Sequence, residues 1–261
     1  MTTTGLPEPL LRLSGINKSF GAVHVLHDVD FAVYPGQVTA LVGDNGAGKS
    51  TLVKTIAGIY SAESGERYFA GLPVTINGPR DAADLGIEVV YQDLALCDNL
   101  DIVQNMFLGR EQMRGVVLDE NTMEARARET LASLSVRTVK SVRQSVSSLS
   151  GGQRQTVAIA KSVLWNSKVV LLDEPTAALG VAQTRQVLDL VRRLADQGLG
   201  VVLISHNMVD VFEVADRITA LYLGRVAADV ATADVTHSQV VELITAGRSG
   251  DLGLTTSGTT A

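Results

Sequence analysis

The sequence contains one cysteine, few aromatic residues, no excess of basic side chains and no long hydrophobic run. Because Cys97 has no second cysteine to pair with, an intramolecular disulfide is excluded, and a reducing cytoplasm is the expected compartment. A net charge of −6 with scattered lysines and arginines argues against a nucleic-acid partner, which would need a basic surface to neutralise its phosphates. No apolar run approaches the roughly 18 residues of a membrane-spanning helix. The polar start, Met1–Gly5, does not resemble a signal peptide, so we expect a soluble chain.

The length of 261 residues and an apolar content of 46% fit one domain with a subdomain better than two independent domains. Residues 1–8 are predicted to form a polar tail, and the Gly/Ser/Thr-rich stretch 247–261 is predicted to be disordered. Between them, strand-like and helical patterns alternate, with short strands expected near 67–69 and 74–76. The region of about residues 94–160 shows no strand alternation, so it is predicted to be an inserted helical subdomain.

The most specific motif is a glycine-rich stretch between a predicted strand and a predicted helix. It reads Gly43-Asp44-Asn45-Gly46-Ala47-Gly48-Lys49-Ser50-Thr51, which is the G-x-x-x-x-G-K-S pattern of a phosphate-binding loop. Backbone N–H groups at the helix start would point at one spot, where the helix dipole also favours negative charge. Lys49 would reach the β- and γ-phosphates of ATP, and the Ser50 hydroxyl could ligate Mg²⁺. The alternative is a glycine-rich turn that binds nothing, which the flanking strand and helix disfavour.

Further polar residues follow predicted buried strands, at the edge where α/β domains bind their ligands. Asp173 ends the apolar run 169–172, where a carboxylate is costly unless it serves a cation such as Mg²⁺. Glu174 follows and could orient or deprotonate a water that attacks the γ-phosphate, although an ordinary acidic turn is the alternative. His206 and Gln92 also follow strands. Considered alone, His206 would more often be a structural histidine, and Gln92 would be a polar loop residue.

The stretch Leu149-Ser150-Gly151-Gly152-Gln153 opens a predicted helix with two glycines, which makes a second anion-binding helix end. With this stretch the chain resembles the ATP-binding cassette (ABC) transporter ATPases, whose signature motif it matches. The resemblance covers about residues 10–246, with all motifs in the family's order. It implies one ABC ATPase domain over residues 9–246. The expected fold class is α/β, a RecA-like phosphate-loop NTPase core with an antiparallel β subdomain and an inserted α-helical subdomain.

The resemblance also implies roles for individual residues. Phe20 would stack on adenine, although it could instead be a core residue. The other implied contacts are Val25 beside the sugar, Lys49, Glu174, His206 and Gln92 as catalytic groups, and Ser50, Gln92 and Asp173 around Mg²⁺. Ser150 and Gly152 would touch the ATP of an opposite cassette, since this family sandwiches two ATP molecules between two cassettes. A chain with one phosphate loop and one signature therefore needs a partner cassette, most simply a second copy.

One stretch departs from the family pattern. Where the family usually has Ser-Ala-Leu-Asp after the Pro-Thr behind the acidic pair, this chain has Ala177-Ala178-Leu179-Gly180. That loop normally communicates between the two ATP sites, so Gly180 leaves their coupling open. Because Glu174 and His206 are both present, an active ATPase is favoured over a cassette that only binds ATP.

Several stretches resemble the cassettes of bacterial sugar importers of the ribose, xylose and fructose type, namely Val90–Leu96, Asn105–Glu111, Leu149–Gln155 and Asp173–Val181. This resemblance implies an ATPase subunit on the inner face of the cell membrane, bound to transmembrane permease subunits. An extracytoplasmic sugar-binding protein would belong to the same system. The alternatives are an importer of another small solute and a soluble cassette ATPase acting on nucleic acid or the ribosome. The acidic balance and the lack of long heptad repeats count against the second alternative.

Overall fold

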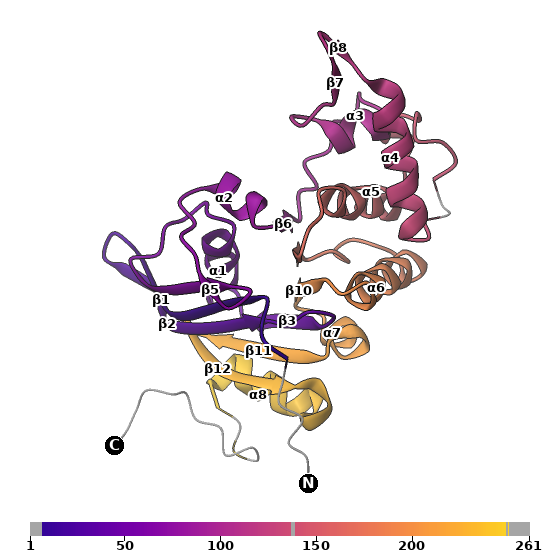
Figure 1. Ribbon diagram of the computed structural model, residues 1–261. Helices are drawn as coiled ribbons and strands as arrows, with labels where there is room; N and C mark the ends of the chain where they lie inside the picture. Colours follow the sequence, from indigo (N-terminus) through magenta and orange to yellow (C-terminus); the bar gives the residue numbers. More distant parts are fainter. Residues whose placement is uncertain (1–6, 137–138, 249, 251–261) are drawn as a thin grey trace.

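The computed structural model describes residues 7–136, 139–248 and 250 (Figure 1). Most of the predicted tail 1–8 and nearly all of the predicted disordered stretch 247–261 lie outside the described residues. The strands are β1 (Leu11–Phe20), β2 (Val23–Val33), β3 (Val38–Gly43), β4 (Ser64–Phe69), β5 (Leu72–Pro73), β6 (Ile87–Val90), β7 (Met113–Arg114), β8 (Val117–Leu118), β9 (Val169–Asp173), β10 (Gly200–Ile204), β11 (Arg217–Tyr222) and β12 (Arg225–Ala231). The helices are α1 (Lys49–Ile56), α2 (Pro79–Asp84), α3 (Ile102–Phe107), α4 (Glu120–Ser133), α5 (Gly151–Val163), α6 (Val181–Asp196), α7 (Met208–Val214) and α8 (His237–Ala246), with short 3₁₀ turns η1 (Val146–Ser148) and η2 (Thr232–Asp234).

The centre of the fold is a six-stranded sheet in the order β12-β11-β3-β10-β9-β6. All neighbouring pairs run parallel except β11 and β12, which are antiparallel. Strands β3, β9 and β10 are buried along almost their whole length, which explains why their sequences are continuous apolar runs. Because these strands run parallel, their carboxyl ends and the loops that follow them meet at one edge of the sheet.

A second, antiparallel sheet has the order β2-β1-β4-β5 and supplies most of the N-terminal part. The predicted strand near 74–76 was wrong. The edge strand β5 ends at Pro73, whose missing N–H interrupts a ladder. Val74 donates one more hydrogen bond, to the Arg67 carbonyl at 2.9 Å, before the chain turns toward α2. The antiparallel sheet beside the parallel one confirms the predicted α/β class with an added β part.

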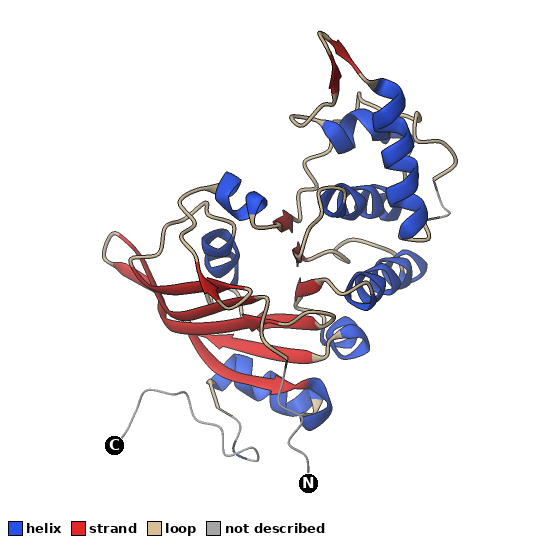
Figure 2. Ribbon diagram, viewed as in Figure 1, coloured by secondary structure: helices blue, strands red, loops and turns tan. Residues whose placement is uncertain are grey.

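Helices α3, α4 and α5 form a part of the molecule that projects from the two sheets (Figures 1 and 2). Asp101 and Asp119 cap α3 and α4 by accepting hydrogen bonds from the backbone N–H groups of Gln104 at 2.7 Å and Thr122 at 3.2 Å. The expectation of a region without strands was wrong, because β7 and β8 pair around Gly115, whose φ of 68° suits a tight turn. The limits of about 94–160 stay a prediction, since α5 packs on both α3 and α6.

Alternate residues of the buried strands face different hydrophobic cores. In β9, Val170 and Leu172 point into a core shared with α3, α4, α5 and α6. Val169 and Leu171 point to the opposite face, into a core with α1 and the antiparallel sheet. The strands that carry the candidate site are therefore packed on both faces. Along the described residues, no helix has both the length and the apolar character needed to cross a membrane.

Candidate nucleotide-binding and hydrolysis site

The phosphate loop lies between β3 and α1, as the sequence predicts. Within the described part of the chain, no hydrogen bond uses the backbone N–H groups of Gly46, Gly48, Lys49 and Ser50. These donors surround the start of a helix, which is where anions bind. Gly48 has a φ of 105°, and a Cβ there would lie 2.9 Å from Leu26 Cδ2, so a glycine is required. The loop is a cradle of available donors that fits a chain of phosphates.

Lys49, the first residue of α1, extends its ammonium across this loop. Its Nζ donates hydrogen bonds to the carbonyl oxygens of Gly43 at 2.7 Å and Asp44 at 3.1 Å. Burial lowers the pKa of Lys49, and the carboxylates of Glu174, Asp44 and Asp173 oppose that shift. The ammonium therefore lies at the loop and interacts with the acidic pair Asp173 and Glu174 at the end of β9, where phosphate oxygens could accept its hydrogen bonds.

Two carboxylates stand at the end of β9. Burial and the neighbouring Glu174 raise the pKa of Asp173, whereas two lysines of α1 oppose the rise. Glu174 has a left-handed backbone with a φ of 49°, which is rare for this residue type. Its N–H donates to the carbonyl of Ile204 in β10 at 2.9 Å, which holds the strained residue in place. Strain of this kind gathers at functional sites, where the surrounding fold supports it.

The Glu174 carboxylate oxygen Oε2 lies 2.9 Å from Nδ1 of His206, which follows β10. The Glu174 side chain is 15% exposed and the His206 side chain is 76% exposed. The carboxylate is thus shielded from bulk water, while the imidazole faces the side from which a ligand would approach. The sequence proposed roles for both residues, and the structure adds that the two side chains touch.

Replacing Asp173 with asparagine is expected to stabilise the nucleotide-free protein at neutral pH while weakening Mg²⁺-dependent ATP binding. A carboxyl whose pKa rises on folding binds its proton more tightly in the folded state, so ionised Asp173 opposes folding. The gain in melting temperature should be present near pH 7 and vanish below the ordinary aspartate pKa of about 4. Thermal unfolding of both proteins across this pH range checks the prediction. A lower melting temperature for Asp173→Asn near pH 7 would contradict it.

Asp210 is a buried residue of this edge that no sequence motif indicated. Its carboxylate accepts hydrogen bonds from the Thr176 hydroxyl at 2.7 Å and from the Asn207 side-chain amide at 3.0 Å. Thr176 follows Glu174, and Asn207 follows His206, so Asp210 ties together the two loops that carry the acidic and histidine groups. The only sequence signal would have been an aspartate within the apolar face of a short helix.

Phe20 and Val25 lie on the antiparallel sheet. The Phe20 ring contacts Tyr60 edge to face, with centroids 5.0 Å apart, and the residue is 42% exposed. This exposure contradicts the alternative of a core phenylalanine and leaves ring surface available for an aromatic base. Val25 lies beside the phosphate loop, because a Cβ on Gly48 would be 3.3 Å from the Val25 carbonyl oxygen. Both positions fit a nucleotide whose phosphates occupy the loop.

The signature stretch lies elsewhere. Ser150 caps α5, with its hydroxyl accepting the Gln153 N–H at 3.4 Å and the Gln153 side-chain oxygen accepting the Ser150 N–H at 2.9 Å. Figure 1 shows α5 in the projecting helical part, apart from α1. The residues that the structure gathers at one sheet edge are Lys49, Asp173, Glu174 and His206, with exposed Gln92 after the adjacent strand β6. The signature of the same chain is not part of this group.

The three residues predicted to hold Mg²⁺ supply oxygen atoms, which this ion prefers. Ser50 is exposed at the start of α1. The pKa of Asp173 is raised because the two nearby lysines do not fully offset the cost of burying its negative charge. Among the described residues, no group of three or more His, Cys, Asp or Glu side chains is arranged so that it could hold a metal ion. Magnesium usually binds through one or two carboxylates plus substrate phosphates, so this sparse set fits an ion that arrives with ATP.

Gly180 precedes α6 with a φ of −73°, and an added Cβ would meet no atom within 4 Å. Gly180→Asp is therefore expected to raise the free energy of unfolding by about 0.5 kcal/mol, because aspartate caps a helix and is less flexible than glycine when unfolded. Gly180→Ala is the matched control, since it reduces the same flexibility without adding a capping oxygen. Urea titration of the three proteins measures the difference; an aspartate variant less stable than the alanine variant would contradict the capping argument.

Comparisons with known proteins indicate the family of this chain. The profile of a family described as ABC transporter matches residues 26–177. A fructose import ATP-binding protein of Rhizobium meliloti is 46% identical over 91% of this chain and 94% of its own length. A xylose/arabinose import ATP-binding protein of Sulfolobus acidocaldarius is 43% identical over 94% of this chain and 97% of its length. A ribose import ATP-binding protein of Rubrobacter xylanophilus is 42% identical over 92% of this chain, which spans 48% of that protein.

Solved structures show the same fold. The structure of CbiO1 from Clostridium perfringens, described as part of an ABC transporter complex, has a TM-score of 0.77 at 26% identity and covers 90% of this chain and 93% of its own. An ATP-binding cassette of another ABC transporter has a TM-score of 0.81 at 24% identity, covering 92% and 99%. These likenesses confirm the predicted phosphate-loop NTPase fold. The chain belongs to the ABC transporter family, as one of its ATP-hydrolysing cassettes.

Proposed function

We propose that this chain is the ATP-hydrolysing subunit of an importer that carries a sugar across the cell membrane. The observation that carries the proposal is the agreement of three relatives at 42–46% identity, whose names all specify import of a sugar. The chain would act on the cytoplasmic face, bound to permease subunits. Sugar specificity would reside in the permease and in an extracytoplasmic binding protein that does not contact this chain.

The gathered side chains support hydrolysis over binding alone. The free N–H groups of the loop and Lys49 would hold the phosphates, and Mg²⁺, when bound, would help to neutralise their charge. Glu174, shielded and in contact with His206, orients the attacking water and accepts its proton. The remaining roles are Phe20 and Val25 beside the adenosine, Ser50, Gln92 and Asp173 around Mg²⁺, and His206 at the γ-phosphate.

A second copy of the chain would complete each ATP site. The signature helix α5 lies apart from the phosphate loop of its own chain (Figure 1), so Ser150 and Gly152 need another cassette to face. Two copies related by a two-fold axis place each signature opposite the other copy's loop, which gives a closed and symmetric dimer. Binding of ATP would close this dimer, and hydrolysis would reopen it.

A groove between residues 91–95 and the helices α3 and α5 supports a contact with the permease. Its volume is about 310 Å³. The lining combines apolar and charged side chains, which suits an amphipathic helical segment. Gln92 lies between two residues that line it, so a segment in this groove would sit next to the Mg²⁺ site. The lining includes Met106, Leu108 and Trp165 among the apolar residues and Glu88, Arg110 and Lys161 among the charged ones.

Reconstitution in proteoliposomes tests the proposal. The chain, its permease and its binding protein should show ATP hydrolysis and solute uptake that a sugar stimulates and amino acids do not. Leu108→Glu, in the groove, should lose this stimulation, whereas Val117→Glu places the same charge on the exposed hairpin outside the groove and should retain it. Failure to assemble with any multi-spanning membrane protein of its own cell, or a salt-sensitive affinity for nucleic acid, would favour a soluble cassette ATPase instead.

A further inference from the structure

The segment that leads into and begins the signature, residues 139–149, contains the short turn η1 and an isolated antiparallel β-bridge between Ser145 and Asp101 as its regular structure. Its backbone is fixed by hydrogen bonds to the stretch 98–103, which precedes and begins α3. These bonds join Val103 N–H to the Val142 carbonyl at 3.2 Å, Val146 N–H to the Leu100 carbonyl at 3.0 Å, and Ser147 N–H to the Asp98 carbonyl at 3.1 Å. The position of the signature is therefore linked to the position of α3.

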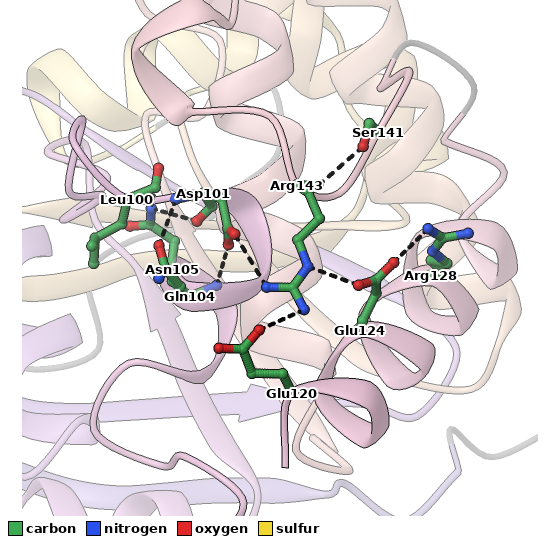
Figure 3. Close-up of polar contacts among 9 residues, drawn as sticks. All are labelled: Leu100, Asp101, Gln104, Asn105, Glu120, Glu124, Arg128, Ser141 and Arg143. Carbon is green, nitrogen blue, oxygen red and sulfur yellow. Dashed lines mark hydrogen bonds and ion pairs between the residues drawn. The ribbon is translucent and has the colours of Figure 1, made fainter. Parts of the chain in front are cut away.

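Arg143 adds a side-chain link from this segment to two helices (Figure 3). Its Nε donates to the Glu124 carboxylate at 2.7 Å, and its two terminal nitrogens pair with Glu120 at 3.1 Å and Asp101 at 3.4 Å. Glu120 and Glu124 belong to α4, and Asp101 is the N-cap of α3. A single guanidinium thus joins the signature segment to α3 and α4, two of the three helices of the projecting part.

Arg143 supplies a positive charge to carboxylates that are partly shielded from water. The side chains of Asp101 and Glu124 are only 16% and 24% exposed, so water screens their charges poorly. The hydrogen bond from Arg143 is the main cause that lowers the pKa of Glu124, with Arg128 second. The other oxygen of Asp101 caps α3, so its position is fixed by the helix as well. A guanidinium reaches several carboxylates with separate N–H groups, which a lysine ammonium cannot match.

We propose that Arg143 is a positioning residue for the signature, which stands seven positions later at Ser150. Through Asp101, Glu120 and Glu124 it fixes the segment 139–149, so that Ser150 and Gly152 reach the ATP of the opposite copy. The inference rests on the proposed sandwich dimer. Because Arg143 lies in the helical part and not at the phosphate loop, its removal should disturb dimer closure while leaving ATP binding by the same chain intact.

The test uses the full-length chain with Glu174→Gln, so that ATP is bound without turnover. Arg143→Gln and Arg143→Lys are added separately to this parent. Arg128→Gln is the matched control, since Arg128 also contacts Glu124 but lies on α4 and is 64% exposed. Analytical ultracentrifugation with Mg·ATP measures dimerisation, a fluorescent ATP analogue with dilute monomer measures nucleotide affinity, and thermal unfolding confirms folding.

Arg143→Gln is expected to raise the dimer dissociation constant by at least about tenfold, because small displacements of positioning groups are costly. Arg143→Lys should lie between this variant and the parent, Arg128→Gln should stay within about twofold, and nucleotide affinity should not change. Equal dimerisation of the Arg143→Gln and Arg128→Gln proteins would overturn the inference, as would a loss of nucleotide affinity that parallels the loss of dimer. A parent that never dimerises with Mg·ATP would instead refute the sandwich itself, and the inference with it.

Discussion

Glu174→Gln is expected to lower the steady-state rate of ATP hydrolysis by about a hundredfold or more, which is the usual contribution of a general base. The substitution keeps the shape of the side chain and its place at the end of β9, but removes the carboxylate that we propose as the acceptor of the water's proton. The carboxylate is shielded, touches His206 and stands on a strained backbone, so no other acid of the described residues is placed equally. Phosphate release, measured as a function of protein concentration, gives the rate.

The matched control for this variant is Glu213→Gln. Glu213 belongs to α7 and makes an exposed ion pair with Arg185 at 3.6 Å, so the same change of charge occurs outside the site. Its hydrolysis rate should stay within about twofold of the unchanged protein, as surface ion pairs contribute little. For the unchanged protein, activity should rise faster than linearly with concentration, since the proposed dimer forms each site from two copies. Linear activity that Glu174→Gln leaves intact would contradict both the dimer and the assigned base.

The residues around the phosphate loop could be predicted because their signals are local. The loop, the strand before it and the helix after it lie within about 20 consecutive residues, and each has its own sequence signature. The carboxylates of β9 were also predictable, since charged groups at the end of an apolar strand need a purpose. The contact between Glu174 and His206, 2.9 Å apart, could be recognised only in the structure. Parallel strands from distant parts of the chain bring the two residues together.

Three features of the structure could not be predicted, because they lie in segments that carry no recognisable sequence motif. Asp210 reads as an ordinary helix residue, yet from a buried position it joins the two loops that carry Glu174 and His206. Arg143 reads as one of many scattered basic residues, yet three carboxylates from two other segments meet it. The hairpin of β7 and β8 has only two residue pairs, too short for an alternating pattern to be seen. The contacts of Asp210 and Arg143 join residues far apart in the sequence, which local sequence patterns do not reveal.

Lys49→Ala is expected to weaken binding of Mg·ATP by roughly ten- to a hundredfold, which corresponds to the loss of charge-assisted hydrogen bonds to phosphate. The Lys49 ammonium already lies across the loop, within hydrogen-bond distance of the Gly43 and Asp44 carbonyls, so it needs little rearrangement to meet the phosphates. Hydrolysis should fall at least as much, because the same charge would stabilise the transition state. Titration with a fluorescent ATP analogue measures the affinity.

Lys54→Ala tests whether Lys49 acts by direct contact with the phosphates or only through the positive charge that it adds to α1. Both lysines belong to this helix, and both oppose the rise in the pKa of Asp173, so either substitution removes one positive charge from the surroundings of the acidic pair. Only Lys49 bonds to the loop, whereas the Lys54 ammonium lies 5.5 Å from the ring of Tyr60. The Lys54 variant should therefore lose no more than a few-fold in affinity, since a screened charge at a distance acts weakly. Equal losses of ATP affinity in the two variants would mean that the overall positive charge of α1, and not direct contact between Lys49 and phosphate, holds the nucleotide.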